Sequence, residues 1–142
     1  MAEKIQFLGK SRFLNKNQRN TIRQALNKLC IKHNYIIDSL VYVHHSDEEL
    51  LKLNQSALQH DNYTDIITFD LSDTVGVIDG EIYLSVDRIK ENALTFGVGF
   101  NNEYHRVLSH GLLHLMGFKD KTKGEKAEMR KQEDLALLLF PD

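Results

Sequence analysis

Two histidines four residues apart, His110 and His114, lie in the stretch HRVLSHGLLHLMGFKD (residues 105–120), and Asp120 follows six positions after the second. Residues i and i+4 of a helix share one face, with Cβ atoms ~5–6 Å apart, so both imidazoles can direct a ring nitrogen to one point. Zinc is bound by histidine nitrogen at ~2.0–2.1 Å and also accepts carboxylate oxygen. The spacing is therefore compatible with a metal site made by His110, His114 and Asp120.

The same histidines could instead be hydrogen-bonded residents of the core. The helix that carries them is apolar on most sides, through Tyr104, Val107, Leu108, Leu112, Leu113, Leu115 and Met116. Two imidazoles buried together need polar partners, and a shared cation satisfies both at once. Gly117 is placed to end the helix and turn the chain so that Asp120 returns over the last turn. Gly111, mid-helix, costs ~1 kcal/mol relative to alanine, and we expect close approach of a ligand or backbone there.

Apolar periodicity indicates strands and helices in no strict alternation. Strands are expected at 5–8, 39–45, 65–71 and 80–86, and helices at 15–34, 46–58, 86–97, 101–116 and 123–140. The last two strands are joined as a hairpin or by a longer excursion. This order favours an α+β fold, with a single mixed β-sheet of about four strands packed by helices and the metal site on a central helix. We expect one domain, residues 1–142.

The other histidines have simpler interpretations. His33 falls in the last turn of the first long helix, where a partly protonated imidazole suits the helix dipole. His44 and His45 end a strand, and we expect both at the surface.

Composition indicates the cellular compartment of the protein. The chain has 142 residues, of which 42% are hydrophobic and 27% charged, and a single cysteine, so no disulfide can form within one chain. Its start lacks the apolar region of a secretory signal, and no apolar run approaches the ~20 residues of a membrane span. We therefore expect a cytoplasmic protein with no membrane association.

The net charge of −2 argues against binding nucleic acid through bulk electrostatics, but the charges are segregated. Basic residues dominate at Lys4, Lys10, Arg12, Lys16, Arg19, Arg23, Lys28 and Lys32, and again from Lys119 to Lys131, whereas 46–87 is acidic. This segregation permits an anionic partner on one face; a solvated face is the alternative.

The sequence resembles the YbeY family, metal-dependent endoribonucleases of ribosomal RNA maturation. The resemblance rests on HGLLHLMGF (110–118), LN (53–54), TDIITFD (64–70), GEIYLS (80–85) and EKAEM (125–129), and it covers about residues 40–133. It implies one α+β domain, one zinc ion held by the two helix histidines and a third ligand, and cleavage of single-stranded RNA. The implied role is processing of 16S ribosomal RNA at the small ribosomal subunit.

The chain departs from the family pattern at two positions. The third ligand is usually a histidine, whereas Asp120 stands here; Glu125 and His60 are the alternatives if Asp120 does not bind. A basic residue suspected of contacting RNA is replaced by Leu58, and His60 lies two positions on.

Three protein ligands would leave a fourth zinc position for a water molecule, which metal binding makes more acidic. Zincin peptidases carry a glutamate directly after the first histidine, and this chain has Gly111 there, which argues against peptide hydrolysis. The identity of a general acid or base stays open. The alternatives are a non-catalytic, ribosome-associated zinc protein and a generic metallohydrolase or peptidase.

Overall fold

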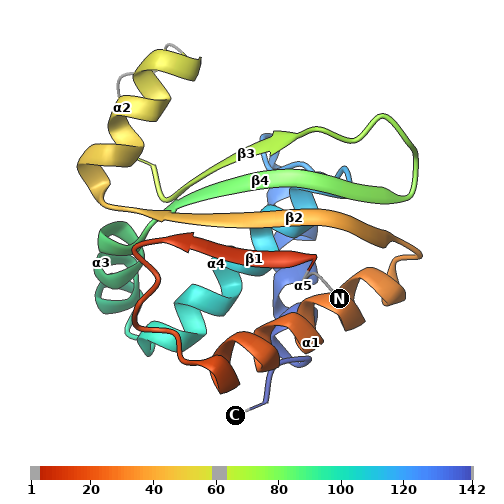
Figure 1. The fold of residues 1–142 in the computed structure, drawn as a ribbon, viewed down its shortest axis with the longest axis horizontal. Helices are drawn as coiled ribbons and strands as arrows, with labels where there is room; N and C mark the ends of the chain where they lie inside the picture. The colour runs from red at the N-terminus through yellow and green to blue at the C-terminus, as the bar shows by residue number, and fades with distance from the viewer. Residues whose placement is uncertain (1–3, 59–63, 142) are drawn as a thin grey trace.

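The computed structural model describes residues 4–58 and 64–141. The strands among these residues form one four-stranded sheet. Its strands are β1 (Ile5–Gly9), β2 (Ile36–His45), β3 (Ile66–Asp70) and β4 (Val77–Ser85), in the order β1-β2-β4-β3. β1, β2 and β4 are parallel, and β3 pairs antiparallel with β4 as a hairpin. The predicted mixed sheet and α+β fold are confirmed (Figure 1).

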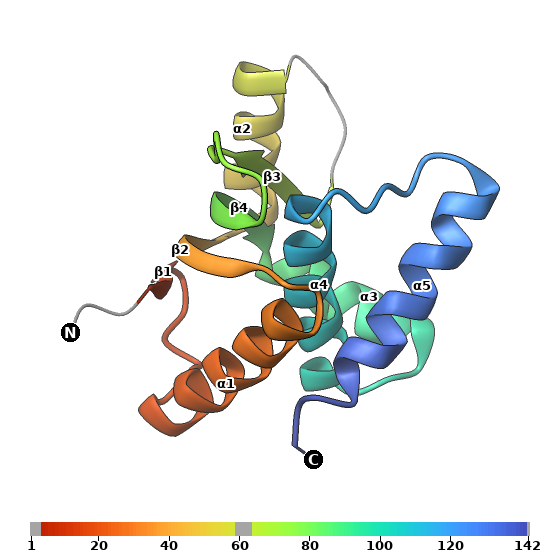
Figure 2. The same ribbon diagram turned by 90° about the vertical axis from the view of Figure 1, so that its right-hand side faces the viewer.

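The helices are α1 (Lys16–Lys32), α2 (Asp47–Leu58), α3 (Val86–Phe96), α4 (Phe100–Leu115) and α5 (Lys123–Leu137). Figure 2 shows α3, α4 and α5 on one side of the sheet, with α4 between the sheet and α5. α4 is therefore the central helix. In the described part of the chain, no helix is long and apolar enough to cross a membrane.

Most element ends lie close to their predicted positions, and the larger differences have a physical cause. β2 and β4 each begin three residues earlier than predicted, because Ile36 pairs with Val77 and extends the parallel ladder. Ile36 is 68% exposed, so no burial pattern marks this extension. α5 ends three residues before Phe140, which turns back and is buried in the core.

Side-chain caps mark the starts of α1, α2, α3 and α5. Ser46 and Glu49 form the predicted capping box of α2: the Glu49 N–H donates to Ser46 Oγ at 3.2 Å and the Ser46 N–H donates to Glu49 Oε1 at 2.9 Å. Thr122 and Glu125 form an equivalent box at the start of α5. That box fixes the direction in which α5 leaves the loop after α4.

The core lies between the sheet and the helices α1 and α4. Ile78, Gly80, Ile82 and Leu84 alternate along β4 toward the helices and are buried. At Gly111 an added Cβ would lie 2.8 Å from Ile66 Cδ1 and 2.9 Å from Ile82 Cδ1. The prediction of a close approach was right, but the group that approaches is the apolar surface of the sheet rather than a ligand or backbone.

The prediction that His44 lies at the surface was wrong. His44 is fully buried: its Nδ1–H donates to the Leu8 carbonyl at 3.0 Å, and its Nε2 accepts from the Tyr104 hydroxyl at 2.7 Å. Burial lowers its pKa to about 4, so it is neutral near pH 7. His33 lies at the C-terminal end of α1, close to its predicted place, and burial and the neighbouring Lys32 lower its pKa. His45 is half-buried.

Candidate metal centre

His110, His114 and Asp120 converge at the end of α4. The two Nε2 atoms are 2.9 Å apart, and Asp120 Oδ2 lies 3.2 Å from each. Their side chains are 20%, 24% and 38% exposed, so the cluster is open to solvent on one side. Among the described residues these three are the one group of His, Cys, Asp or Glu side chains close enough to hold a metal ion.

Helix geometry and one glycine bring the three side chains together. The i, i+4 spacing places both imidazoles on the same face of α4. Gly117 follows in the left-handed region (φ 98°), as predicted, and the Phe118 N–H donates to the Leu113 carbonyl at 3.1 Å. This turn reverses the chain and carries Asp120 back to the histidines.

Each imidazole is oriented by an acceptor at its other nitrogen. His114 Nδ1 lies 2.9 Å from the Phe118 carbonyl oxygen, and His110 Nδ1 lies 2.5 Å from Glu133 Oε2. Because both partners accept hydrogen bonds, both Nδ1 atoms carry the proton, and in the neutral rings both Nε2 lone pairs face the cluster. Lone pairs 2.9 Å apart repel unless a positive charge lies between them. The donor set of two nitrogens and one oxygen therefore fits a zinc-type cation, and acceptors at the far ring nitrogen are typical of metal-ligating histidines.

Glu133 is the acidic partner of this cluster. Its side chain is 8% exposed and also accepts from Arg106 Nη1 at 3.0 Å. Burial would raise the pKa of Glu133, but the hydrogen bonds from His110 and Arg106 outweigh burial and lower it. Burial likewise would lower the pKa of His110, and the contact with Glu133, helped by Asp120 and Asp65, raises it instead. Glu133 and His110 therefore each favour the charged form of the other.

A cavity of about 260 Å³ opens beside His110. Asp65, Glu103, Arg106, Asp120 and Arg130 are among the residues that line it. Burial raises the pKa of both Asp65 and Glu103. The cavity thus combines the candidate metal centre with carboxylates and two guanidinium groups.

Sequence reasoning missed the contribution of α5 to this site. Glu133 lies in a charged helix, where an acidic side chain attracts no notice. One signal was present: Met129, Glu133 and Ala136 are the buried residues of α5, at helical spacing, so a carboxylate occupies an apolar stripe. That position indicates a buried partner, although it does not say which one.

The remaining predicted residues lie elsewhere. Glu125, the alternative third ligand, accepts from the Thr122 N–H at 2.9 Å as the cap of α5 and is absent from the three-residue cluster. Leu58 ends α2, and its side chain, like the whole of His60, lies outside the described residues.

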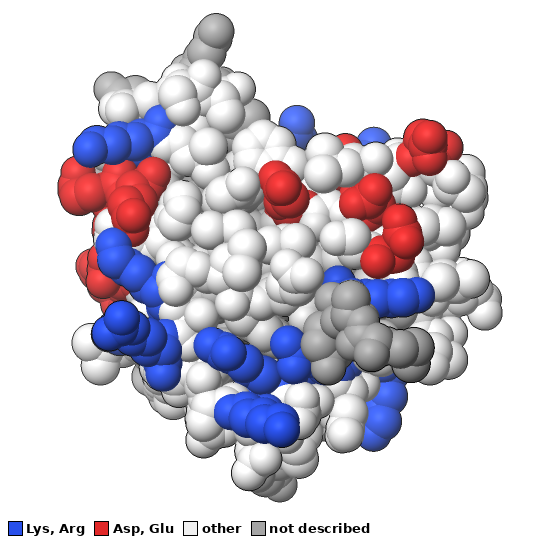
Figure 3. All heavy atoms as spheres, in the orientation of Figure 1, with Lys and Arg blue, Asp and Glu red and all other residues white. Residues whose placement is uncertain are grey.

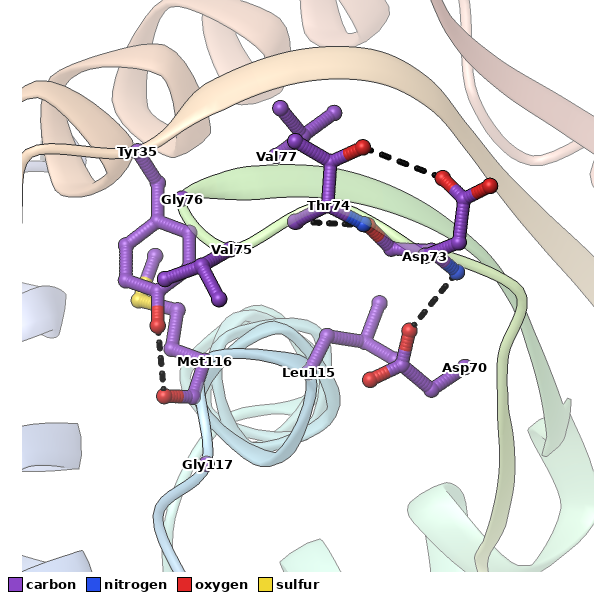
Figure 4. A pocket seen from close by; sticks show the side chains of 11 residues that line it. Tyr35, Asp70, Asp73, Thr74, Val75, Gly76, Val77, Leu115, Met116 and Gly117 are labelled. Atoms are coloured by element: carbon purple, nitrogen blue, oxygen red, sulfur yellow. Dashed lines mark hydrogen bonds between the residues drawn. The ribbon is translucent and has the colours of Figure 1, made fainter.

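A larger cavity of about 380 Å³ lies beside the C-terminal end of α4, next to the β3–β4 turn (Figure 4). There the Tyr35 hydroxyl donates to the Met116 carbonyl at 2.9 Å, which satisfies an acceptor at the helix end. The ionisable side chains among the residues that line it are Tyr35, Asp70 and Asp73, with no histidine or cation. The cavity beside His110 is smaller, but its histidine, carboxylate and guanidinium groups make it the candidate functional site.

Fold and cluster together define a small α+β protein with a candidate metal centre on its central helix. Residues 4–140 match the family model described as Endoribonuclease YbeY. The chain belongs to the YbeY family, as the sequence resemblance predicts.

Individual relatives agree. The chain is 52% identical to an endoribonuclease YbeY of Cytophaga hutchinsonii over 86% of this chain and 85% of the relative. It is 36% identical to that of Porphyromonas gingivalis, over 98% and 91%. The solution structure of TM1509 from Thermotoga maritima is similar, with a TM-score of 0.70 and 26% identity over 95% and 87% of the two chains. Family membership supports an endoribonuclease role for this chain.

Proposed function

We propose that this chain, as one domain of residues 1–142, is a zinc-dependent endoribonuclease that cuts single-stranded RNA. Its proposed role is maturation of ribosomal RNA, including 16S processing at the small ribosomal subunit, in the cytoplasm. The family supports the endoribonuclease activity. The observation that carries the metal dependence is the pair of Nε2 atoms 2.9 Å apart, each 3.2 Å from Asp120 Oδ2.

In this proposal His110, His114 and Asp120 hold one zinc ion. Bound there, zinc would make a coordinated water more acidic and neutralise charge on a scissile phosphate. Glu133 holds the His110 ring in the orientation that exposes Nε2. Arg106 is engaged at both terminal nitrogens, by Glu133 at 3.0 Å and Asp134 at 2.8 Å, and so fixes the position of Glu133.

Arg130 is the guanidinium best placed to meet RNA at this cavity. Its side chain is 63% exposed, and its ion pairs with Glu133 and Asp134 are long, at 3.9 and 4.0 Å. Because Arg130 is exposed and both contacts are long, each pair contributes little, and a phosphate can replace those partners at low cost. In this chain Arg130 can supply positive charge beside the candidate metal centre.

The packing at Gly111 argues against a zincin-type peptidase. A glutamate at this position would start from a Cβ only 2.8 Å from Ile66 Cδ1 and would face the sheet, away from the ligand cluster. The general base of that mechanism therefore has no room. A purely structural zinc site is disfavoured because such sites nearly always have four protein ligands, and the described residues offer three.

The test combines metal analysis with RNA cleavage. Purified protein is expected to contain one zinc per chain and to cut a single-stranded RNA faster than a duplex of the same sequence. His114→Ala should lose both zinc and cleavage. Stoichiometric zinc without cleavage of either RNA would favour the non-catalytic alternative, and cleavage that survives complete removal of metal would refute the proposal.

A further inference from the structure

A second pocket lies at the carboxyl ends of β1, β2 and β4 and takes no part in the candidate metal centre. It encloses about 490 Å³, and its lining includes Lys10, Arg12, Phe13, His45 and Lys90. Lys10, Arg12 and Phe13 follow β1, His45 ends β2, and Lys90 lies in α3, which follows β4. In open sheets with parallel strands, ligands commonly bind outside the carboxyl ends of the strands.

Cations outnumber carboxylates in the lining of this pocket, where Lys10, Arg12 and Lys90 accompany Asp87. Lys10 pairs with Glu49 at 2.5 Å, and Asp87 keeps its negative charge while it accepts from the Asp47 N–H at 3.0 Å. Arg12 and Lys90 are exposed and form no ion pair with the described residues. On the face shown in Figure 3, most Lys and Arg side chains gather in the lower half, over β1 and α1. An anionic ligand would find two free cations here.

The pocket also has an aromatic wall and an unsatisfied polar atom. Phe13 is 39% exposed, and its ring is held by edge contacts, with centroids 5.5 Å from Phe100 and 5.3 Å from Tyr104. His45 Nδ1 is buried and has no hydrogen-bond partner among the described residues. A rigid aromatic ring beside cations is the combination that binds single-stranded nucleic acid, by base stacking and phosphate neutralisation.

The pocket is close to the candidate metal centre along one edge of the sheet. His45 of β2 is the register partner of Ser85 of β4, and the Ser85 N–H donates to the Asp65 carbonyl at 3.0 Å. Asp65 lines the cavity beside His110. Neighbouring strands are ~4.8 Å apart, so two spacings, ~10 Å, separate the backbones of His45 and Asp65. A strand of a few nucleotides can span that distance.

We propose that this pocket binds one nucleotide of the RNA a few positions from the scissile bond, with Arg12 and Lys90 on its phosphate and its base against Phe13. The inference rests on the proposed endoribonuclease function and adds a second contact that helps to select single-stranded substrates. A duplex cannot place one unstacked base against Phe13.

Binding to a single strand tests the pocket. Zinc-loaded protein is titrated, by fluorescence anisotropy over a range of salt, into a single-stranded DNA, which presents phosphates and bases without being an endoribonuclease substrate. Arg12→Ala and Lys90→Ala should each weaken binding and reduce the slope of log K against log[salt] by ~0.7 for a lost phosphate contact. Phe13→Leu should weaken binding about tenfold with an unchanged slope. Lys28→Ala removes the same charge from an exposed position of α1 outside the pocket and is the matched control.

The outcomes separate the two proposals. The pocket proposal is wrong if Arg12→Ala and Lys90→Ala bind single-stranded DNA with the same affinity and salt slope as Lys28→Ala. If the wild type still cleaves single-stranded RNA, the endoribonuclease proposal stands. Pocket-dependent binding without any cleavage of RNA refutes the endoribonuclease proposal alone, and absence of DNA binding by a wild type that cleaves single-stranded RNA refutes the pocket proposal alone. Thermal unfolding of Phe13→Leu must match the wild type; if it does not, Phe13→Tyr, which keeps the ring and should bind like the wild type, decides the role of the aromatic wall.

Discussion

Glu133→Gln should weaken metal binding while leaving the fold intact. The substitution preserves side-chain volume but removes the carboxylate that accepts from His110 Nδ1 at 2.5 Å and from Arg106 at 3.0 Å. A glutamine has one acceptor oxygen for these two donors, so the ring of His110 loses its fixed orientation or Arg106 loses a partner. Changes to groups that orient a ligand typically cost 10–100-fold in metal affinity. We expect a loss of ~10–100-fold, or about 1.4–2.7 kcal/mol.

The assay is a zinc titration against a competing chelator. Asp134→Asn is the matched control, because Asp134 accepts from Arg106 at 2.8 Å but is 58% exposed and makes no contact with His110 in the described structure. It should bind zinc within about twofold of the wild type, as surface ion pairs contribute little. Equal losses in the two variants, or wild-type affinity in Glu133→Gln, would show that Glu133 does not position His110.

Three further predictions concern ligands, packing and pH. His114→Ala and Asp120→Ala should lose or weaken zinc binding by elemental analysis while the circular dichroism spectrum stays helical, because helix packing comes from the surrounding leucines; retained stoichiometric zinc would remove that residue from the ligand set. Gly111→Ala should lower the free energy of unfolding in urea by about 1 kcal/mol, since overpacking at the 2.8–2.9 Å contacts with the sheet costs more than the helix propensity that alanine gains; a more stable variant would contradict this. His44 has a folded pKa of about 4 against an ordinary value of 6.5, so the unfolded state binds more protons between these values and stability falls as pH drops through that window. His44→Gln should flatten the fall, by up to about 3 kcal/mol, in urea titrations at pH 4–7, and an identical pH dependence would show that other groups cause it.

The elements were predictable because each one carries a local signal. Alternating and helical spacing marked every strand and helix, and the i, i+4 histidines with Gly117 marked the cluster. The burial of His44 was not predicted because its strand carries hydrophobic residues on both faces. Tyr42 and Val43 point to opposite faces and both are hydrophobic, so the alternation could not tell which face the helices cover. Only the packing of α4 on the sheet decides that His44 is inside.

Contacts between distant segments could not be predicted in the same way. His110 and Glu133 are separated by 23 positions, and the register between α4 and α5 brings them together. The capping box of Thr122 and Glu125 sets where α5 starts, and the apolar stripe that contains Met129 sets its rotation. Both signals are in the sequence, but their joint consequence, a carboxylate at Nδ1 of His110, depends on three-dimensional packing.

α4 also shows how one helix limits the chemistry at its own end. Adjacent residues of a helix are ~100° apart, so a helix that turns His110 and His114 toward the cavity turns Gly111 toward the sheet. The sheet fills that space with Ile66 and Ile82, which excludes any side chain that could act as a base from position 111. Ionisable groups must then reach the cavity from other turns or other elements, as Asp65, Glu103 and Glu133 do. The packing that makes this helix central therefore requires that its site be completed by the rest of the fold.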